Sequence, residues 1–286
     1  MQTETPNDDI IRFWNDIAAP KFIRFRTAMT TSLAEHGRFA LERFPPRAGA
    51  AILDVGCGFG DAAAELAERA GPSGTVLGID CARPFIDLAR REFEEPPRIR
   101  FEVADEQTHR FDERFDYVFS RFGTMFFSNP VRALRNLREA TRPGGRLAMV
   151  VWRTVEENPW AYAPKRIALA HLPPVTEPVE SCGPGPFSMA SPALVTRLLT
   201  AAGWSEIEVA PCDAPFRLGT LDEAVQLSLA LGPAGEIVRE AGARAVEKLP
   251  LIVADLERHF AAHREGDFVV AKSASLTFTA INPEDG

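Results

Sequence analysis

Three glycines alternate with other residues directly after a short apolar run that contains an acid. The stretch is AILDVGCGFG, residues 51–60, in which Asp54 precedes Gly56, Gly58 and Gly60. Glycine adopts the left-handed conformations of a tight turn and lets a ligand approach the main chain. A helical pattern follows at once, so the N–H groups of its first turn face the same place. The spacing therefore predicts a nucleotide-like ligand at a strand–loop–helix junction.

Two nucleotide-type ligands compete for this loop. A dinucleotide fold uses G-x-G-x-x-G, but the position of its third glycine holds Asp61. An acid at that helix N-terminus also disfavours a pyrophosphate. Asp54, two residues before the first glycine, instead suits a ligand that carries an ammonium and a sulfonium group. A plain structural role for Asp54, accepting N–H groups of the loop, stays open.

The stretch ILDVGCGFG resembles the first motif of class I methyltransferases that depend on S-adenosyl-L-methionine (SAM), and further motifs follow in the family's order. The resemblance covers roughly residues 50–152. It is nearest to the small-molecule branch that includes the ubiquinone and menaquinone C-methyltransferases, the methyltransferase type 11 domain. It implies SAM as cofactor, S-adenosyl-L-homocysteine (SAH) as product, and a Rossmann-like, doubly wound α/β fold. The implied sheet has seven mostly parallel strands, the last antiparallel, with added helical N-terminal and lid segments.

The resemblance also implies roles for single residues. Asp80, which ends the second strand, would bind the ribose hydroxyls, or cap the next helix. Phe85 would lie on the adenine, or pack in the core, and Asp105 would accept from the adenine amino group beside Glu106. The implied cofactor-binding residues are Asp54, Gly56, Cys57, Gly58, Gly60, Asp80, Cys81, Phe85, Asp105, Glu106, Ser120 and Arg121.

The methyl acceptor is expected beyond the fourth strand. Arg121 is a charge at the end of a buried strand and needs a partner, for which a substrate acid, the SAM carboxylate and Asp54 all remain open. His171 is the candidate base, with a structural role as its alternative. The expected acceptor-binding residues are Arg121, Met125, Trp152, Trp160 and Phe187.

The expected activity is in-line transfer of a methyl group from SAM to O or C of a small, apolar or aromatic molecule. Such an enzyme mainly positions two reactants and excludes water. Two alternatives stay open: an inactive accessory protein that binds SAM or SAH, and an NAD-dependent oxidoreductase. The identity of the acceptor is open, and a homodimer is a further expectation.

Alternating strands and helices must position these residues. Strands are expected at 51–56, 75–80, 99–105, 115–122 and 146–152, with helices at 61–70, 83–93 and 130–142. This rhythm predicts right-handed crossovers and a parallel sheet. Later elements are helices near 160–171, 191–203, 221–231 and 235–262, and strands at 205–211 and 267–281.

Four parts of the chain are expected. Residues 1–46 form an N-terminal helical cap interrupted at Pro20, and residues 47–152 form the SAM-binding core. Residues 153–190 form a lid or insert. Residues 191–286 complete the core sheet, with a helical lid insertion at about 220–262 over its carboxyl edge.

Composition limits the classes further. With 286 residues, 45% hydrophobic and 25% charged, the chain has the composition of a soluble globular protein. Its net charge of -8 disfavours nucleic acid as a partner. Cys57, Cys81, Cys182 and Cys212 lack C-x-x-C spacing, so no metal site is expected. No apolar run could span a membrane and the first residues do not resemble a signal peptide, so a cytoplasmic location is expected.

Overall fold

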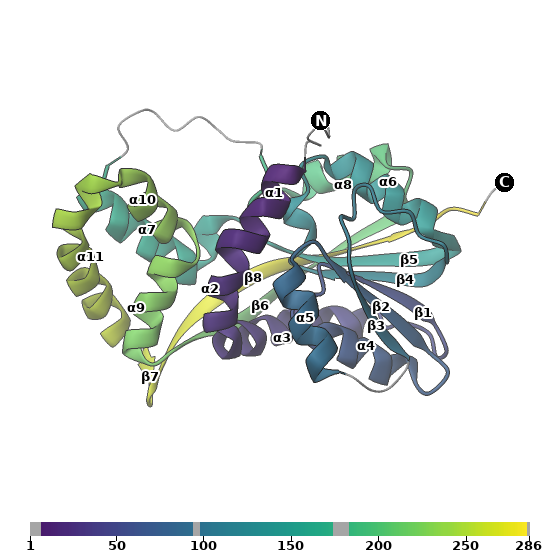
Figure 1. Cartoon of the computed structure of the whole chain (residues 1–286), viewed down its shortest axis with the longest axis horizontal. Helices are drawn as coiled ribbons and strands as arrows, with labels where there is room; N and C mark the ends of the chain where they lie inside the picture. The colour runs from purple at the N-terminus through teal and green to yellow at the C-terminus, as the bar shows by residue number, and fades with distance from the viewer. Residues whose placement is uncertain (1–6, 94–97, 174–182, 285–286) are drawn as a thin grey trace.

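A twisted sheet with helices on both faces forms the centre of the protein (Figure 1). The computed structural model describes residues 7–93, 98–173 and 183–284. Its strands are β1 (Ala51–Val55), β2 (Thr75–Asp80), β3 (Ile99–Val103), β4 (Phe115–Arg121), β5 (Thr141–Trp152), β6 (Ser205–Gly219), β7 (Arg264–Glu265) and β8 (Phe268–Ile281).

The strand order is β3-β2-β1-β4-β5-β8-β6, with the two-residue β7 paired to β8. Strands β1 to β5 are parallel, whereas β8 runs antiparallel to both β5 and β6. The predicted doubly wound sheet with an antiparallel last strand is therefore confirmed; β7 was not predicted. The order reverses between β1 and β4, which places a crevice at the carboxyl ends of these strands.

The strand residues are buried on both faces because helices cover both sides of the sheet. In β1, Ile52, Leu53 and Val55 are fully buried. The continuous apolar run that predicted this strand is typical of a parallel sheet between two helical layers.

The helices form two layers on the sheet and a further group at its end. Their bounds are α1 (Asp8–Arg12), the π-helix η1 (Phe13–Ala18), α2 (Ala19–Arg24), α3 (Arg26–Arg43), α4 (Asp61–Ala70), α5 (Arg83–Glu92), the 3-10 turn η2 (Thr124–Phe126), α6 (Pro130–Ala140), the 3-10 turn η3 (Val155–Glu157), α7 (Pro159–His171), α8 (Pro192–Ala201), α9 (Leu221–Ala230), α10 (Pro233–Ala241) and α11 (Ala243–Ala261). Helices α3, α4 and α5 lie on one face of the sheet, and α6 and α8 on the other (Figure 1).

Two segments stand outside these layers. Helices α7, α9, α10 and α11 pack on one another and form the lid, at the far end of the long β6–β8 ribbon (Figure 1). Residues 7–24, which include α1, η1 and α2, form the N-terminal strap between the lid and the sheet. The backbone stays helical through Pro20, in helix α2, which follows the π-helix directly; the break between helices falls instead at Phe25, which has a ψ of 22°.

Several element boundaries differ from the prediction, most of them by one or two residues. Strand β6 continues to Gly219 instead of residue 211, because Pro211 and Pro215 are tolerated on an edge strand, where no neighbour needs their N–H groups. The helical run expected at 235–262 breaks at Gly242, which has a left-handed φ of 54°. Helix α6 ends at Ala140, and β5 begins at the next residue with an irregular register.

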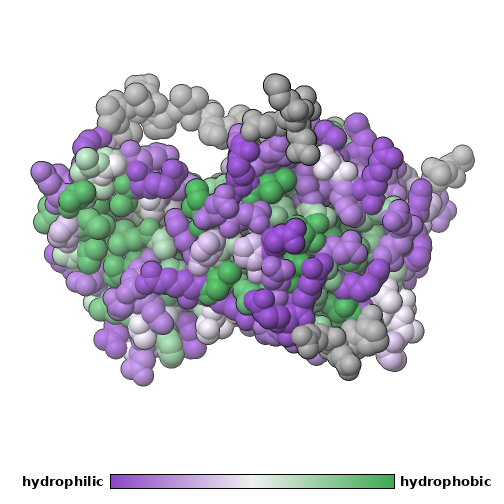
Figure 2. Space-filling model, in the orientation of Figure 1, coloured by the Kyte–Doolittle hydropathy of each residue, from purple (hydrophilic) through white to green (hydrophobic). Residues whose placement is uncertain are grey.

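The surface differs between the two ends of the molecule. Figure 2 shows apolar residues over the lid and mainly hydrophilic residues over the opposite end. On α11, the side chains of Val246, Leu249 and Leu251 are exposed. Within the part of the chain that the structure describes, no helix combines the length and apolarity that crossing a bilayer requires. The expected homodimer and cytoplasmic location stay predictions.

Candidate functional site

The glycine loop after β1 has the left-handed conformations for which glycine was expected. The φ angles of Gly56, Gly58 and Gly60 are 66°, 54° and 85°. A Cβ atom on Gly58 would meet no atom within 4 Å, so this position faces open space. A Cβ on Gly60 would instead lie 2.7 Å from Cζ of Phe101. Gly58 therefore leaves room for a ligand, while Gly60 allows close packing.

A central cavity of about 520 Å³ opens at this loop. It lies between the loops that follow β1, β2 and β4, the N-terminal strap and the lid. Its volume falls within the range of about 300–1,000 Å³ that is typical of small-molecule sites. The predicted site residues that line it are Asp54, Gly56, Cys57, Gly58, Asp80, Cys81, Phe85, Glu106, Arg121, Met125, Trp152, Trp160 and Phe187.

Four predicted site residues do not line the central cavity: Gly60, Asp105, Ser120 and His171. The hydroxyl of Ser120 is buried and donates to the carbonyl of Val55 at 2.8 Å, which ties β4 to β1. His171 lies at the end of α7, and its Nε2 is 2.8 Å from Oδ2 of Asp255. This lid contact explains His171 as a structural residue, and its position lends no support to the role of a base.

Asp54 is a buried acid of the site, with an oxygen left unsatisfied by the described residues. Its side chain is 1% exposed and lines the cavity, and Oδ2 has no hydrogen-bond partner among the described residues. Burial raises the pKa of Asp54 to about 7; Arg121 opposes this shift, and Asp61 and Asp80 add to it. A buried carboxylate oxygen without a partner is costly, and a ligand cation would satisfy it.

Asp80 and Glu106 extend this acidic end of the cavity. Asp80 accepts the N–H groups of Gly58 at 3.0 Å and Ala82 at 2.8 Å, so it shapes the glycine loop and the turn before α5, whose N-cap has no side-chain hydrogen bond. Burial raises the pKa of Asp80 to about 6, against the two N–H groups. Burial also raises the pKa of Glu106 well above its ordinary value, and Asp80 adds to this shift. Each oxygen of Asp80 keeps a lone pair for a ligand hydroxyl.

The partner of Arg121 is Asp61, which was not among the three expected partners. Nη2 of Arg121 lies 2.5 Å from Oδ2 of Asp61, and the two side chains are 9% and 29% exposed. The absence of a side chain at Gly37 makes room for the guanidinium group, since a Cβ there would lie 3.0 Å from Cδ of Arg121. Asp61, which argued against a dinucleotide, thus also holds a cation at the middle of the cavity.

Aromatic rings form the opposite wall of the cavity. The rings of Phe122 and Trp152 stack with centroids 3.9 Å apart, and those of Trp160 and Phe216 stack at 4.5 Å. Phe122 has a φ of 62°, a strained conformation for a residue with a side chain. Such strain concentrates at functional sites. Phe122, Trp152 and Trp160 all line the cavity, which gives this end a flat apolar surface.

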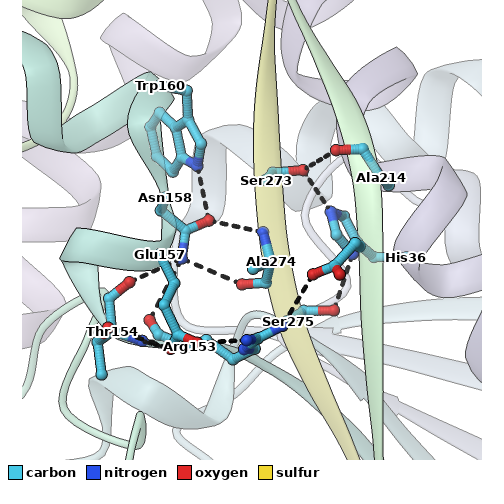
Figure 3. A network of polar contacts seen from close by, with 11 residues as sticks. His36, Arg153, Thr154, Glu157, Asn158, Trp160, Ala214, Ser273, Ala274 and Ser275 are labelled. Carbon is cyan, nitrogen blue, oxygen red and sulfur yellow. Dashed lines mark hydrogen bonds and ion pairs between the residues drawn. The ribbon is translucent and has the colours of Figure 1, made fainter.

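His36, on α3, lies beside Ser273 and Ser275 of β8 (Figure 3). Its Nε2 and Nδ1 each lie 2.8 Å from a hydroxyl, of Ser273 and Ser275 respectively. Ser273 donates to the carbonyl of Ala214, so Nε2 of His36 carries the proton and Nδ1 accepts. Burial and then Arg121 lower the pKa of His36 to about 4. A neutral imidazole thus packs edge-on against Trp152, with ring centroids 5.1 Å apart.

Asn158 holds the other side of the same strand segment (Figure 3). Its Oδ1 accepts from the N–H of Ala274 at 2.9 Å and from Nε1 of Trp160 at 3.1 Å. Its Nδ2 donates to the carbonyls of Ala274, Thr154 and Arg153. One fully buried amide therefore fixes the start of the lid and the Trp160 ring to β8.

Met125 fixes the loop that brings Phe187 to the cavity. Its carbonyl accepts from the N–H of Gly185 at 3.0 Å and from the hydroxyl of Ser188 at 2.6 Å. Phe187 lies between these two residues and lines the cavity. Both residues were expected to bind the acceptor, and the structure joins Met125 to the residues on either side of Phe187.

The N-terminal strap covers the acidic end. Trp14 lies 6.1 Å from Phe85 and 5.4 Å from Phe22 between ring centroids. Asn15 donates to the carbonyl of Cys81 at 3.0 Å and accepts from the N–H of Arg83 at 3.0 Å. The strap is thereby joined directly to the loop that follows Asp80.

Sequence reasoning missed several residues that shape the site: Asn7, Asn15, His36, Asn158 and the pairing role of Asp61. Their partners are distant in the chain. A polar residue such as His36 inside an apolar helical pattern is the only signal that could have singled one of them out.

The cysteines contribute bulk to the site. Cys57, Cys81 and Cys212 are free thiols, and Cys182 lies outside the described residues. Burial raises the pKa of Cys57, and the nearby Asp54 adds to this shift. A thiol held protonated is a poor nucleophile, so no reactive role is proposed for Cys57.

The cavity fits SAM on two independent observations. The oxygen of Asp54 that has no hydrogen-bond partner among the described residues would be satisfied by a cationic group. The open space beside Gly58 lets a ligand approach the main chain closely. Asp80, with lone pairs left on both oxygens, suits the hydroxyls of a ribose.

Comparison with known proteins also indicates a methyltransferase. Residues 52–145 match the sequence profile of a family described as methyltransferase domain. Nocamycin O-methyltransferase of Saccharothrix syringae is 30% identical over 249 residues, which are 82% of this chain and 86% of that protein. A ubiquinone/menaquinone biosynthesis C-methyltransferase of Bdellovibrio bacteriovorus is 31% identical over 153 residues, 52% of this chain and 65% of its own.

A solved structure agrees in fold. Phosphoethanolamine N-methyltransferase 2 of Haemonchus contortus, in complex with SAM, matches with a TM-score of 0.58 at 17% identity over 99% of this chain and 61% of that one. For three of the curated relatives, the Bdellovibrio protein among them, this chain spans 36%, 65% and 40% of their length.

The chain belongs to the class I SAM-dependent methyltransferases. SAM is the cofactor of this family, as the glycine loop predicted. The oxidoreductase alternative is thereby superseded.

Proposed function

We propose that this protein transfers the methyl group of SAM to an oxygen or carbon atom of a small, apolar or aromatic molecule. The observation that carries the proposal is the two-ended cavity. An acidic end with Asp54 and Asp80 meets an aromatic end with Phe122, Trp152 and Trp160 in one continuous space. A cation-bearing cofactor and an apolar acceptor can meet in it.

At the acidic end, SAM would supply a methyl group already activated on a sulfonium. Asp54 would accept from the ligand's ammonium group, and Asp80 from the ribose hydroxyls. Gly56 and Gly58 would let the main chain approach the ligand, while Phe85 and Trp14 cover it. These roles leave the chemistry to the cofactor and the orientation to the protein.

At the aromatic end, Phe122, Trp152, Trp160 and Phe187 would hold a flat acceptor against the methyl group. Arg121, held by Asp61, lies between the two ends and would donate hydrogen bonds to an acceptor oxygen. Holding two reactants in line and excluding water can supply much of the rate enhancement of such a transfer.

Oxygen is the favoured accepting atom. The relative that matches 82% of the chain is named an O-methyltransferase, and that name supports this choice. Carbon stays the competing choice, because a relative that matches 52% of the chain is named a C-methyltransferase.

The test is methyl transfer from labelled SAM to a panel of phenols, quinols and carboxylic acids, followed by mass spectrometry of the products. We expect a labelled product and SAH with at least one acceptor class, and loss of both in Gly58→Ala. Binding of SAH without transfer to any acceptor would favour the accessory-protein alternative. Absence of SAH and SAM binding would refute the site assignment itself.

The expected partner and the expected division of the chain into parts also remain proposals. The acceptor would be the protein's small-molecule partner, and no nucleic acid is proposed. The division at residues 46, 152 and 190 would separate cap, core and lid.

A further inference from the structure

Asn7, at the start of the N-terminal strap, stands between Asp105 and the central cavity. Its side chain lines the cavity and is 5% exposed, whereas Asp105 does not line it. Nδ2 of Asn7 donates to Oδ1 of Asp105 at 2.7 Å, and Oδ1 of Asn7 accepts from the hydroxyl of Ser128 at 2.7 Å. The amide is thus held from two loops, after β3 and after β4.

Protein donors already occupy three of the acceptor positions of the Asp105 carboxylate, and this residue does not line the cavity. Besides Asn7, Oδ1 accepts from the N–H of Gln107 at 3.1 Å, and Oδ2 accepts from the hydroxyl of Thr108 at 2.9 Å. The resemblance implied that Asp105 accepts directly from the adenine amino group. In this protein the residue that presents a polar group to the cavity at this place is Asn7.

The two contacts determine which way the amide of Asn7 points. A carboxylate only accepts hydrogen bonds, so the NH₂ group must face Asp105, and the hydroxyl of Ser128 then donates to the carbonyl oxygen. An asparagine amide has two N–H donors and two lone pairs. One donor and one acceptor therefore remain for a ligand.

This remaining pair matches one edge of adenine. The amino group of adenine donates next to a ring nitrogen that accepts, and asparagine pairs with adenine through two such hydrogen bonds in nucleic-acid recognition. The neighbouring part of the cavity suits a flat ring, because Trp14, Phe85 and Phe126 line it, with Trp14 and Phe126 centroids 4.8 Å apart. Hypoxanthine, which has a carbonyl in place of the amino group, would oppose its acceptor to the oxygen of Asn7.

We propose that Asn7 recognises the adenine ring of SAM through its free amide edge, and that Asp105 and Ser128 are positioning residues that set the orientation of this amide. The N-terminal strap would then contribute specificity for the base besides covering it. This inference rests on the SAM site of the proposed function.

The test is calorimetric titration with SAH and with S-inosyl-L-homocysteine, in which the adenine amino group is a carbonyl. We expect the wild-type protein to prefer SAH by about tenfold or more, because the analogue leaves a buried acceptor opposite another acceptor. Asn7→Ala should lose most of this preference. Ser128→Ala should lose part of it, because the amide can then rotate.

Asn15→Ala is the matched control. Asn15 also joins the strap to a loop, but it does not line the central cavity. Loosening the strap there should weaken both ligands by the same factor and leave their ratio unchanged. Thermal melting of each variant verifies that it is folded.

The outcomes separate this inference from the proposed function. A wild-type protein that binds SAH and the inosine analogue equally well would overturn the inference and leave the proposed function intact. The inference fails in the same way if Asn7→Ala and Asn15→Ala lower both affinities in parallel. A wild-type protein that binds neither ligand would overturn the proposed function and this inference with it.

Discussion

At the scale of single residues, the site contains a buried carboxyl group whose ionised form lowers the stability of the folded protein. Asp54 lies buried with an unpartnered oxygen, and burial raises its pKa to about 7. Its folded pKa lies above the ordinary 3.8, so the folded protein binds this proton more tightly than the unfolded chain. Stability from this group is therefore lost as the pH rises from the ordinary value to the folded value.

We expect Asp54→Asn to stabilise the protein without ligand and to weaken its binding of SAH. Above about pH 7 the wild type carries a buried charge that asparagine lacks, so the variant should gain about 1 kcal/mol or more in unfolding free energy. Urea unfolding at about pH 8 measures the first effect and calorimetry the second. A variant that is less stable and binds SAH as well as the wild type would contradict both.

The same residue predicts a pH dependence of cofactor binding. A ligand ammonium prefers the ionised form of Asp54, which becomes populated as the pH rises through its pKa of about 7. The affinity for SAH should therefore increase from about pH 6 to about pH 8. Below the pKa of Asp54 the increase should reach at most about tenfold per pH unit, and above that pKa it should level off. In Asp54→Asn this dependence should flatten; a parallel slope in the two proteins would assign it to another group.

Gly58 and Gly71 offer a matched pair for the loop. Both have left-handed φ angles, 54° and 74°, and a Cβ on either would meet no atom within 4 Å, but only Gly58 lines the cavity. Gly58→Ala should cost about 1 kcal/mol of stability and Gly71→Ala about 1–3 kcal/mol, because the ψ of -171° at Gly71 suits glycine almost alone. Only Gly58→Ala should strongly lower SAH affinity, to the point that methyl transfer is no longer detected, because its methyl group enters the ligand's space. Equal affinities would show that the loop does not contact the cofactor.

At the scale of elements, buried amides join segments that are distant in the chain. Asn158 links η3 and α7 to β8, and Asn15 links the strap to α5. These side-chain amides form hydrogen bonds with backbone groups that have no partner within a helix or sheet. Removing such an amide leaves buried polar groups without a hydrogen bond. The position of the lid over the cavity therefore depends on few residues.

Asn158→Ala should destabilise the protein by about 2–4 kcal/mol, because it orphans two buried N–H donors, of Ala274 and Trp160. Asn136→Ala is the comparison: its amide only donates, to the carbonyls of Glu106 and His109. Carbonyls tolerate the loss of a partner better, so this variant should lose about 1 kcal/mol. Urea unfolding compares the two, and equal losses would argue against the role of Asn158 as a clamp.

At the scale of the whole molecule, buried groups give opposite dependences of stability on pH. The folded pKa of His36, about 4, lies below its ordinary 6.5, so the folded protein binds this proton less tightly than the unfolded chain. Stability from His36 is therefore lost as the pH falls from 6.5 towards 4. The raised pKa values of Asp54 and Asp80 act in the other direction over an overlapping range.

Replacing His36 by glutamine should reveal how much His36 contributes to the pH dependence of the unfolding free energy. The difference in unfolding free energy between wild type and His36→Gln should shrink by about 2 kcal/mol from about pH 7 to about pH 5, because only the wild type resists protonation of a buried imidazole. Denaturant unfolding at several pH values measures it. A difference that stays constant with pH would show that His36 titrates as it does in an unfolded chain.

Much of the fold followed from local patterns. The apolar run before Asp54, the glycine spacing and the alternation of strands and helices depend on residues near one another, so they predicted β1 to β5 and the helices between them. Prediction failed where tertiary context overrides local preference. The prolines of β6 are tolerated only because that strand forms an edge of the sheet.

The sequence by itself determined the strand–turn–helix junction that carries Asp54 and the three glycines, because local backbone rules govern all of these residues. Only the tertiary structure decided which partners the other site residues have. Asn7 meets Asp105 across 98 positions, Arg121 meets Asp61 across 60, and His36 meets Ser273 across 237. Such contacts form where packed elements bring distant side chains within a few ångströms, and no local pattern records that placement.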